Sequence, residues 1–125
     1  MDITPKIPEG RQVVERYGAG RFTISGTVHQ GSVLVTAEAT VPWAVADAGG
    51  ITLEALEPLL AKSADLDVVL LGCGPRAVLL PRALRDALKD HGLVVEAMDT
   101  GAAARTYNVL MAEERPVAAA LIAVE

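Results

Sequence analysis

The spacing of hydrophobic residues changes near residue 50, and this change divides the chain into two predicted halves. Residues 12–45 contain short alternating or β-branched runs, separated by single glycines every few residues. This pattern predicts a strongly twisted antiparallel sheet, in which residues 30–32 form a hairpin turn. Residues 1–11 include Pro5 and Pro8, which disfavour a helix, so we expect an extended arm there.

From residue 52 onward, hydrophobic residues recur at helical spacing and then in continuous runs typical of buried strands. Thr52 is a candidate cap for the first helix, and Pro58 must kink or restart that helix. Right-handed crossovers would make the strands of this half mostly parallel. The predicted order is a strand at 67–71, a helix from 81 to 91, a strand at 93–98, a helix from 100 to about 114, and a strand at 116–124.

These elements predict a single α/β domain over residues 1–125, built as a three-layer β+α/β arrangement. The antiparallel strands would occupy residues 12–45, and the β-α-β-α-β part would occupy residues 52–125. Because neither half is large enough to hold a core alone, we expect the two halves to share one core. Aromatic residues make up only 3% of the chain, so this core must consist mainly of Val, Leu, Ile and Ala.

Composition excludes several classes of function. The formal net charge is −5 at pH 7 and no stripe of Lys or Arg is present, so nucleic acid is not an expected partner. The only cysteine, Cys73, excludes an internal disulfide or a multi-cysteine metal site, and we expect it to be packed. No hydrophobic run is long enough for a transmembrane segment, and no signal-peptide pattern is visible. We therefore expect a cytoplasmic protein without metal or cofactor, in which an exposed sheet edge would allow a homodimer.

A block of hydrogen-bonding side chains at residues 105–108 follows three alanines in the last predicted helix. We expect this helix to begin at its cap, Thr100, behind a strand end, where free N–H groups and the helix dipole favour an anion. An anion bound there would contact Thr100, Arg105 and Asn108. The alternative is a structural network, in which buried polar groups satisfy one another. Its members would be Asp99, Thr100, Thr106 and Tyr107.

A glycine-containing loop, GCGPR, follows the first predicted parallel strand. Ligands of open α/β sheets bind at such carboxyl ends, and glycines allow the backbone to approach a ligand closely. Gly72, Gly74 and Arg76 therefore complete a candidate small-anion site, in the crevice between this loop and the helix start at 100–108. A dinucleotide is not predicted, because the next helix begins near Pro81, too late to direct its N-terminus at a pyrophosphate.

The segment VVLLGCGP, followed by LRDALKDHGLVVEAMDTGAAARTYNVLMAEERPVAAALI, resembles a family of small domains. The family includes mitochondrial complex I assembly factor 3, the adipogenesis-associated domain protein and many short prokaryotic proteins. The upstream segment YGAGRFTISGTVHQGSVLVT is similar to the family's N-terminal sheet. The resemblance implies a single three-layer domain and, for the mitochondrial members, a role in assembling respiratory complex I. It implies no catalytic activity.

Two functions remain as hypotheses. In the first, the chain is a non-catalytic assembly or scaffold protein that binds respiratory-chain subunits or their assembly machinery, and it reaches a membrane only through that partner. In the second, it binds a small anion between the 72–76 loop and the 100–108 helix start, in an enzymatic or sensing role. The sequence has no evident pairing of a nucleophile with a base, which favours the first hypothesis.

Overall fold

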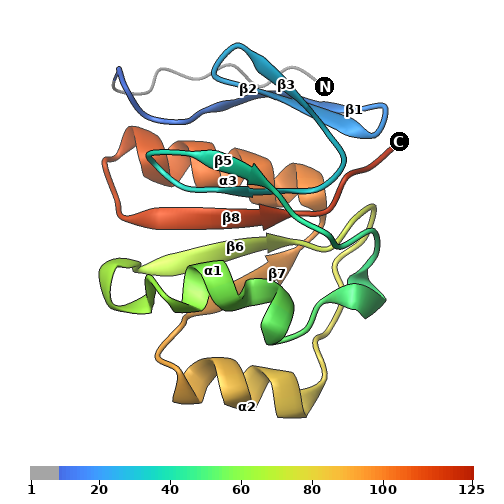
Figure 1. Cartoon of the computed structure of the whole chain (residues 1–125), viewed down its shortest axis with the longest axis vertical. Helices are drawn as coiled ribbons and strands as arrows, with labels where there is room; N and C mark the ends of the chain where they lie inside the picture. The colour runs from blue at the N-terminus through green and yellow to red at the C-terminus, as the bar shows by residue number, and fades with distance from the viewer. Residues whose placement is uncertain (1–8) are drawn as a thin grey trace.

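The computed structural model describes residues 9–125, which contain two sheets, three α-helices and three short 3₁₀ helices. Most of the predicted N-terminal arm lies outside these residues. The N-terminal sheet has the order β1-β2-β3, and the central sheet has the order β5-β4-β8-β6-β7 (Figure 1). The strands are β1 Val14–Gly18, β2 Arg21–Ile24, β3 Thr27–Gln30, β4 Val33–Val35, β5 Thr40–Pro42, β6 Val68–Gly72, β7 Val95–Met98 and β8 Val117–Leu121. The α-helices are α1 Glu57–Leu60, α2 Arg82–Asp90 and α3 Thr100–Ala112.

The strands β6, β7 and β8 of the central sheet run parallel, which confirms the predicted β-α-β-α-β order of the second half. β4 pairs antiparallel with β8, and β5 pairs antiparallel with β4. α2 connects β6 to β7 on one face of this sheet, whereas α3 connects β7 to β8 on the other. The two connections leave the carboxyl ends of β6 and β7 towards opposite faces. In open α/β sheets, ligands usually bind at such a position.

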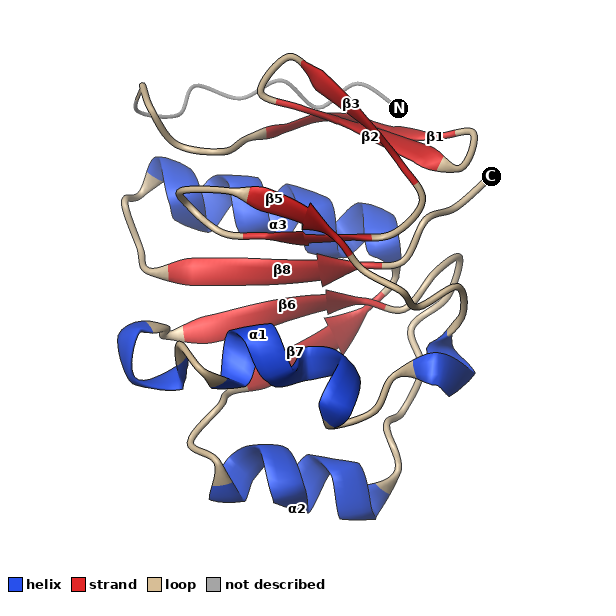
Figure 2. Cartoon of the chain, viewed as in Figure 1, coloured by secondary structure: helices blue, strands red, loops and turns tan. Residues whose placement is uncertain are grey.

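Each face of the central sheet has its own hydrophobic core. On one face, Leu59 of α1 and Leu88 of α2 belong to the same cluster as Val69 of β6. On the other face, Tyr107 of α3 packs in one cluster with Phe22 of the N-terminal sheet. The layers are therefore α1 with α2, the central sheet, and α3 with the N-terminal sheet (Figure 2). This arrangement confirms the predicted three-layer α/β fold.

The prediction for residues 12–45 is wrong in one respect, because these strands do not form a single sheet with a turn at 30–32. The chain instead leaves the N-terminal sheet after β3 and enters the central sheet at β4. Ser32 holds this crossing: its carbonyl accepts from Trp43 N–H, and its hydroxyl oxygen accepts from Ala123 N–H, both at 2.9 Å. All three residues of β4 are hydrophobic and buried, because this strand lies between β5 and β8.

Pro58 restarts the helical segment after residue 52, as its position predicts. A 3₁₀ helix at Glu54–Leu56 ends just before α1, and Pro58 lies in the first turn of α1. The missing N–H of a proline costs no hydrogen bond at that position. The N-cap position of the 3₁₀ helix is Leu53, one residue after the predicted cap Thr52, although the Thr52 hydroxyl oxygen does accept from Ala55 N–H at 3.1 Å.

Candidate functional site

The carboxyl end of β6 and the start of α3 meet at Gly72, Gly74 and Thr100, three of the predicted anion contacts. Thr100 N–H donates to the Gly74 carbonyl at 2.8 Å, and Gly74 N–H donates to the Thr100 hydroxyl oxygen at 3.0 Å. The Thr100 hydroxyl in turn donates to the Ile122 carbonyl at 2.7 Å. A Cβ atom on Gly72 would lie 2.9 Å from Thr100 Cα, so the backbones are in close contact. The polar groups of this buried junction thus bond to one another where the crevice was expected.

The cap of α3 is Asp99, one residue before the predicted cap Thr100. Its carboxylate accepts from Ala102 N–H at 2.9 Å, and its backbone is extended, as an N-cap requires. Thr100 is already the first helical residue, and its hydroxyl bonds to the segments that follow β6 and β8. The carboxylate of Asp99 therefore supplies negative charge at the helix N-terminus, where a bound anion was expected.

Tyr107 and Asn108 attach α3 to the N-terminal part of the chain. The Asn108 side chain accepts from Val14 N–H at 3.0 Å and donates to the Val14 carbonyl at 2.7 Å, so it pairs with β1 as a neighbouring strand would. The Tyr107 hydroxyl lies 2.9 Å from the Gln12 carbonyl oxygen and 3.2 Å from that of Thr36. Burial raises the pKa of Tyr107 well above its usual value, because a phenolate would lose its hydration. Asn108, a predicted ligand contact, uses both ends of its amide on β1.

The predicted polar network of Asp99, Thr100, Thr106 and Tyr107 is distributed over the fold. Asp99 bonds within α3, whereas Thr100 bonds to the segments that follow β6 and β8. Thr106 donates to the sulfur of Met98 at 3.7 Å, and Tyr107 reaches the segments before β1 and after β4. Thr100, Thr106 and Tyr107 thus each join α3 to a different segment, whereas Asp99 caps the helix itself.

Arg105 lies on the exposed side of α3, and its Nη1 donates to the Tyr17 hydroxyl at 3.0 Å. A Cβ atom on Gly101 would lie 2.5 Å from this hydroxyl, so Tyr17 rests directly on the first turn of α3. The sequence could not predict this contact, because Tyr17 stands 88 positions before Arg105. Arg105 is therefore directed towards the N-terminal sheet, with Tyr17 as its bonded neighbour.

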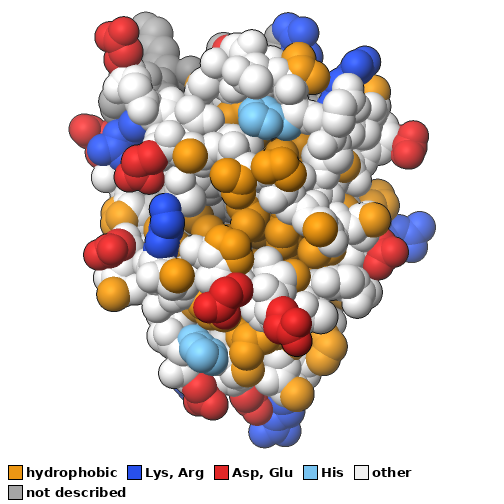
Figure 3. Space-filling model, viewed as in Figure 1, with side chains coloured by type: hydrophobic (Ala, Val, Ile, Leu, Met, Phe, Trp, Pro, Cys, Tyr) orange, Lys and Arg blue, Asp and Glu red, His pale blue; other side chains and the backbone are white. Residues whose placement is uncertain are grey.

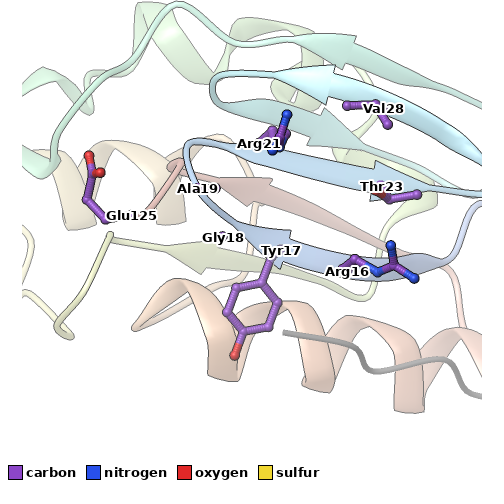
Figure 4. Close-up of a pocket in the computed structure, with 8 residues that line it drawn as sticks. All are labelled: Arg16, Tyr17, Gly18, Ala19, Arg21, Thr23, Val28 and Glu125. Atoms are coloured by element: carbon purple, nitrogen blue, oxygen red, sulfur yellow. The ribbon is translucent and has the colours of Figure 1, made fainter.

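Tyr17 also lines a cavity of about 610 Å³ at the end of the N-terminal sheet. Figure 4 shows its ring pointing from β1 towards α3, while Arg16 and Arg21 extend from the same hairpin. Among residues 9–125, the charged side chains of the lining are those of Arg16, Arg21 and Glu125. The other lining residues are Gly18, Ala19, Thr23 and Val28.

A second cavity, of about 780 Å³, lies between α2, the loop at 77–80 and β7. Its lining is mainly hydrophobic and includes Arg85 and Lys89. Sequence reasoning missed it, although the run Val78-Leu79-Leu80 in a predicted loop was a usable signal. Arg76, the remaining predicted anion contact, is exposed just before this loop and lines neither cavity. The remaining residues that line the second cavity are Ala77, Leu88, Gly92, Leu93, Val94, Val95 and Ala97.

Groups with the potential for chemistry are few in the described part of the chain. Cys73 is buried, and burial raises the pKa of its thiol, which disfavours the thiolate that a nucleophile needs. Within residues 9–125, no three His, Cys, Asp or Glu side chains converge as a metal site would require. The helices of the same range are too short or too polar to span a bilayer. On the face drawn in Figure 3, charged side chains of both signs are scattered around a hydrophobic centre.

The fold and these surfaces define a small α/β domain whose mixed central sheet lies between two helices and a third helix that supports an antiparallel sheet. The chain belongs to the family described as protein of unknown function (DUF498/DUF598), whose profile matches residues 14–122. Its relatives include NADH dehydrogenase [ubiquinone] 1 alpha subcomplex assembly factor 3 of Danio rerio, which is 32% identical over 122 residues. That alignment covers 98% of this chain and 70% of the relative. The resemblance predicted from the sequence is thereby confirmed.

Two further proteins are more similar to this chain. An uncharacterized protein of Rhodobacter capsulatus is 40% identical over 122 residues, which cover 96% of this chain and 93% of the relative. The crystal structure of a Bartonella henselae protein, described as an outer membrane protein, superposes with a TM-score of 0.86 at 36% identity. That superposition covers 96% of this chain and 100% of the other. The α/β fold is thus shared across nearly the whole length of the domain.

Proposed function

We propose that this chain is a non-catalytic assembly protein, which binds a protein partner during the maturation of a respiratory complex. The observation that carries the proposal is its 32% identity, over 98% of the chain, to zebrafish assembly factor 3. That relative is named for the assembly of NADH dehydrogenase, so the expected partners are respiratory-chain subunits or their assembly machinery. The chain would work in the cytoplasm and reach the membrane through its partner.

The surface of the chain also supports binding in preference to catalysis. Val78, Leu79 and Val94 are large hydrophobic residues that are exposed around the second cavity. Contiguous exposed hydrophobic surface marks interaction sites more often than chance. The Thr100 hydroxyl and the Asn108 amide, which a catalytic site could use, are instead bonded to backbone groups inside the core.

Affinity capture tests this function. A tagged chain is expressed at its native level in the source cells, cross-linked mildly and purified beside an untagged control. We expect mass spectrometry to recover NADH dehydrogenase subunits or their assembly machinery. Deletion of the gene should lower the amount of assembled enzyme on native gels, and re-expression should restore it. Repeated recovery of no component of that pathway, with normal enzyme in the deletion strain, would refute the proposal.

As a second candidate function, we propose binding of a small anion in the cavity lined by Arg16 and Arg21. The guanidinium groups of Arg16 and Arg21 suit phosphate or carboxylate ligands. Arg105, one of the predicted anion contacts, bonds to Tyr17, which is among the lining residues. The crevice at the 72–76 loop is less suitable, because its backbone groups already bond to α3.

Thermal unfolding with phosphate, sulfate, citrate or nucleotides tests the second candidate. A ligand that binds only the folded chain raises the Tm. We expect one of these anions to raise the Tm of the wild type, and Arg21→Gln to abolish the increase. Arg82→Gln removes the same charge from the exposed surface of α2 and should leave the increase intact. A Tm that no anion changes would remove this candidate.

A further inference from the structure

The outer edge of β7 has no neighbouring strand among residues 9–125, because β7 is the last strand of the central sheet. On the inner side, the Val94 and Met98 carbonyls accept from N–H groups of β6 and the residue after it, each at 2.8 Å. Backbone groups alternate between the two sides of a strand, so the N–H and C=O groups of Val95 and Ala97 point outward. Such an edge is a template for pairing with another chain.

The hydrophobic cavity of about 780 Å³ borders this edge on the α2 face. Val95 and Ala97 line it from β7, while α2 and the loop at 77–80 supply most of the remaining lining. Leu79 is 81% exposed and Val94 is 56% exposed, so large hydrophobic side chains face water here. An added strand would direct every second side chain to this face, where the cavity can receive it.

The charges around the cavity distinguish between its potential occupants. Arg85 and Lys89 line the cavity, and no Asp or Glu belongs to its lining in the part of the chain that the structure describes. In a chain with a net charge of −5, this surface is locally cationic and therefore favours an acidic segment. A second copy that paired through β7 would bring the same two cations from each copy into one interface, where they would repel.

We propose that β7 and this cavity form a docking site for an extended segment of a protein partner. The side chains that the segment directs to the cavity, at alternate positions, include both hydrophobic and acidic residues. The segment adds a strand by pairing with the outward groups of Val95 and Ala97, and its hydrophobic side chains pack beside Leu79. Its acidic residues lie near Arg85 and Lys89. A respiratory-chain source for the segment rests on the proposed function, whereas the docking mode rests on β7 and its cavity.

A synthetic peptide of about seven residues, in which two valines and two aspartates occupy the alternate positions that share one face of a strand, tests the docking mode. The peptide is titrated into the ¹⁵N-labelled chain, and amide hydrogen exchange is followed by NMR. We expect exchange at Val95 and Ala97 to slow by about tenfold or more with saturating peptide. The Glu96 N–H, which faces β6, should change little. Lack of binding, or binding without protection of Val95 and Ala97, would overturn the proposal.

Variants assign the binding to the edge and its cavity. Ala97→Pro removes an outward N–H without removing a donor from the pairing with β6. We expect Ala97→Pro and Leu79→Ser each to weaken the peptide by about tenfold or more. Val109→Ser removes a similarly exposed hydrophobic side chain (57%) from α3 and should change nothing. Unchanged affinity in both edge variants would overturn the site, and Leu79→Ser decides the matter if Ala97→Pro fails to fold.

The charge preference and the alternative occupants have tests of their own. Replacing the aspartates of the peptide with lysines should weaken binding, and equal affinity would overturn the acidic part of the proposal. Analytical ultracentrifugation of the wild type and of Ala97→Pro should show the same oligomeric state, which means that no dimer forms through β7. A dimer that Ala97→Pro abolishes would assign the edge to a second copy and overturn the partner segment.

Failure of the docking site is distinguishable from failure of the proposed function. If wild type and Leu79→Ser both capture NADH dehydrogenase components equally, the docking site is refuted and the function stands. If the peptide protects Val95 and Ala97 but capture recovers no such components, the docking mode stands and the proposed function is refuted.

Discussion

The two faces of the central sheet differ in how they are held together. On the α3 face, buried polar side chains bond to backbone far away in the chain, as Asn108 does with Val14 and Thr100 with Ile122. On the α2 face, a hydrophobic core predominates, and an open cavity lies beside β7. The comparison indicates that the α3 face fixes the arrangement of the two sheets, whereas the α2 face leaves surface available for binding.

The physical reason for this difference is the cost of an unpaired polar group. A buried donor or acceptor that loses its partner costs about 1–3 kcal/mol, so the α3 face tolerates little change. An exposed hydrophobic residue contributes little to stability, because it is solvated in both the folded and the unfolded chain. Substitutions should therefore affect stability on the first face and binding on the second.

The largest effect is expected for Tyr107→Ala on the α3 face. It removes a fully buried ring and leaves the Gln12 and Thr36 carbonyls without the hydroxyl as donor, so we expect a loss of about 3 kcal/mol in the free energy of unfolding. Urea unfolding monitored by circular dichroism measures this loss. Val109→Ala, at an exposed position of the same helix, is the control and should change little. An unchanged urea midpoint for Tyr107→Ala would contradict the assigned role of α3.

A smaller loss is expected for Gly72→Ala, at the junction with α3. The new Cβ would lie 2.9 Å from the backbone at Thr100, which cannot move away easily, and we expect a loss of about 2 kcal/mol. Gly101→Ala is a matched control, because its Cβ meets the hydroxyl of Tyr17, the far end of a flexible side chain. Chemical denaturation of both variants should show the larger loss at Gly72. Equal losses would mean that the junction is less tightly packed than the distances imply.

Because of Tyr107 on the α3 face, the free energy of unfolding should also fall in alkaline solution. Burial raises the pKa of Tyr107 above its usual value of 10.0, so above that pH the unfolded chain releases a proton that the folded chain retains. Unfolding is then favoured, and this residue lowers the stability by up to about 1.4 kcal/mol per pH unit. Tyr107→Phe should be less stable at neutral pH but should lose this part of the slope. Unfolding curves at several pH values measure both slopes, and identical slopes would argue against the assignment.

The smallest effect on stability is expected for Leu79→Ser on the α2 face. Because this side chain is 81% exposed, we expect the free energy of unfolding to change by no more than about 0.5 kcal/mol. Leu88→Ser, at a buried position that lines the same cavity, should be strongly destabilising. A large loss in Leu79→Ser would show that the loop belongs to the core, and would remove the contrast between the faces.

The candidate site could be predicted only in part. The pattern of strand ends and glycines correctly brought Gly72, Gly74 and Thr100 together, because consecutive parallel strands end at the same edge of a sheet. It did not predict that these residues bond to one another, or that Arg105 bonds to Tyr17. The pattern places side chains on a helix face, but it does not say which distant segment that face meets.

The sequence by itself determined the three parallel strands, α2, α3 and the restart of the helix at Pro58. The signals for these elements are local: hydrophobic spacing, continuous apolar runs and residues that favour or break a helix. Only the tertiary structure decided that the chain changes sheets after residue 30, that Asn108 pairs with β1, and that a cavity opens beside β7. Each of these features depends on segments far apart in the chain, whose distance in space is set by packing of the whole domain and not by any local pattern.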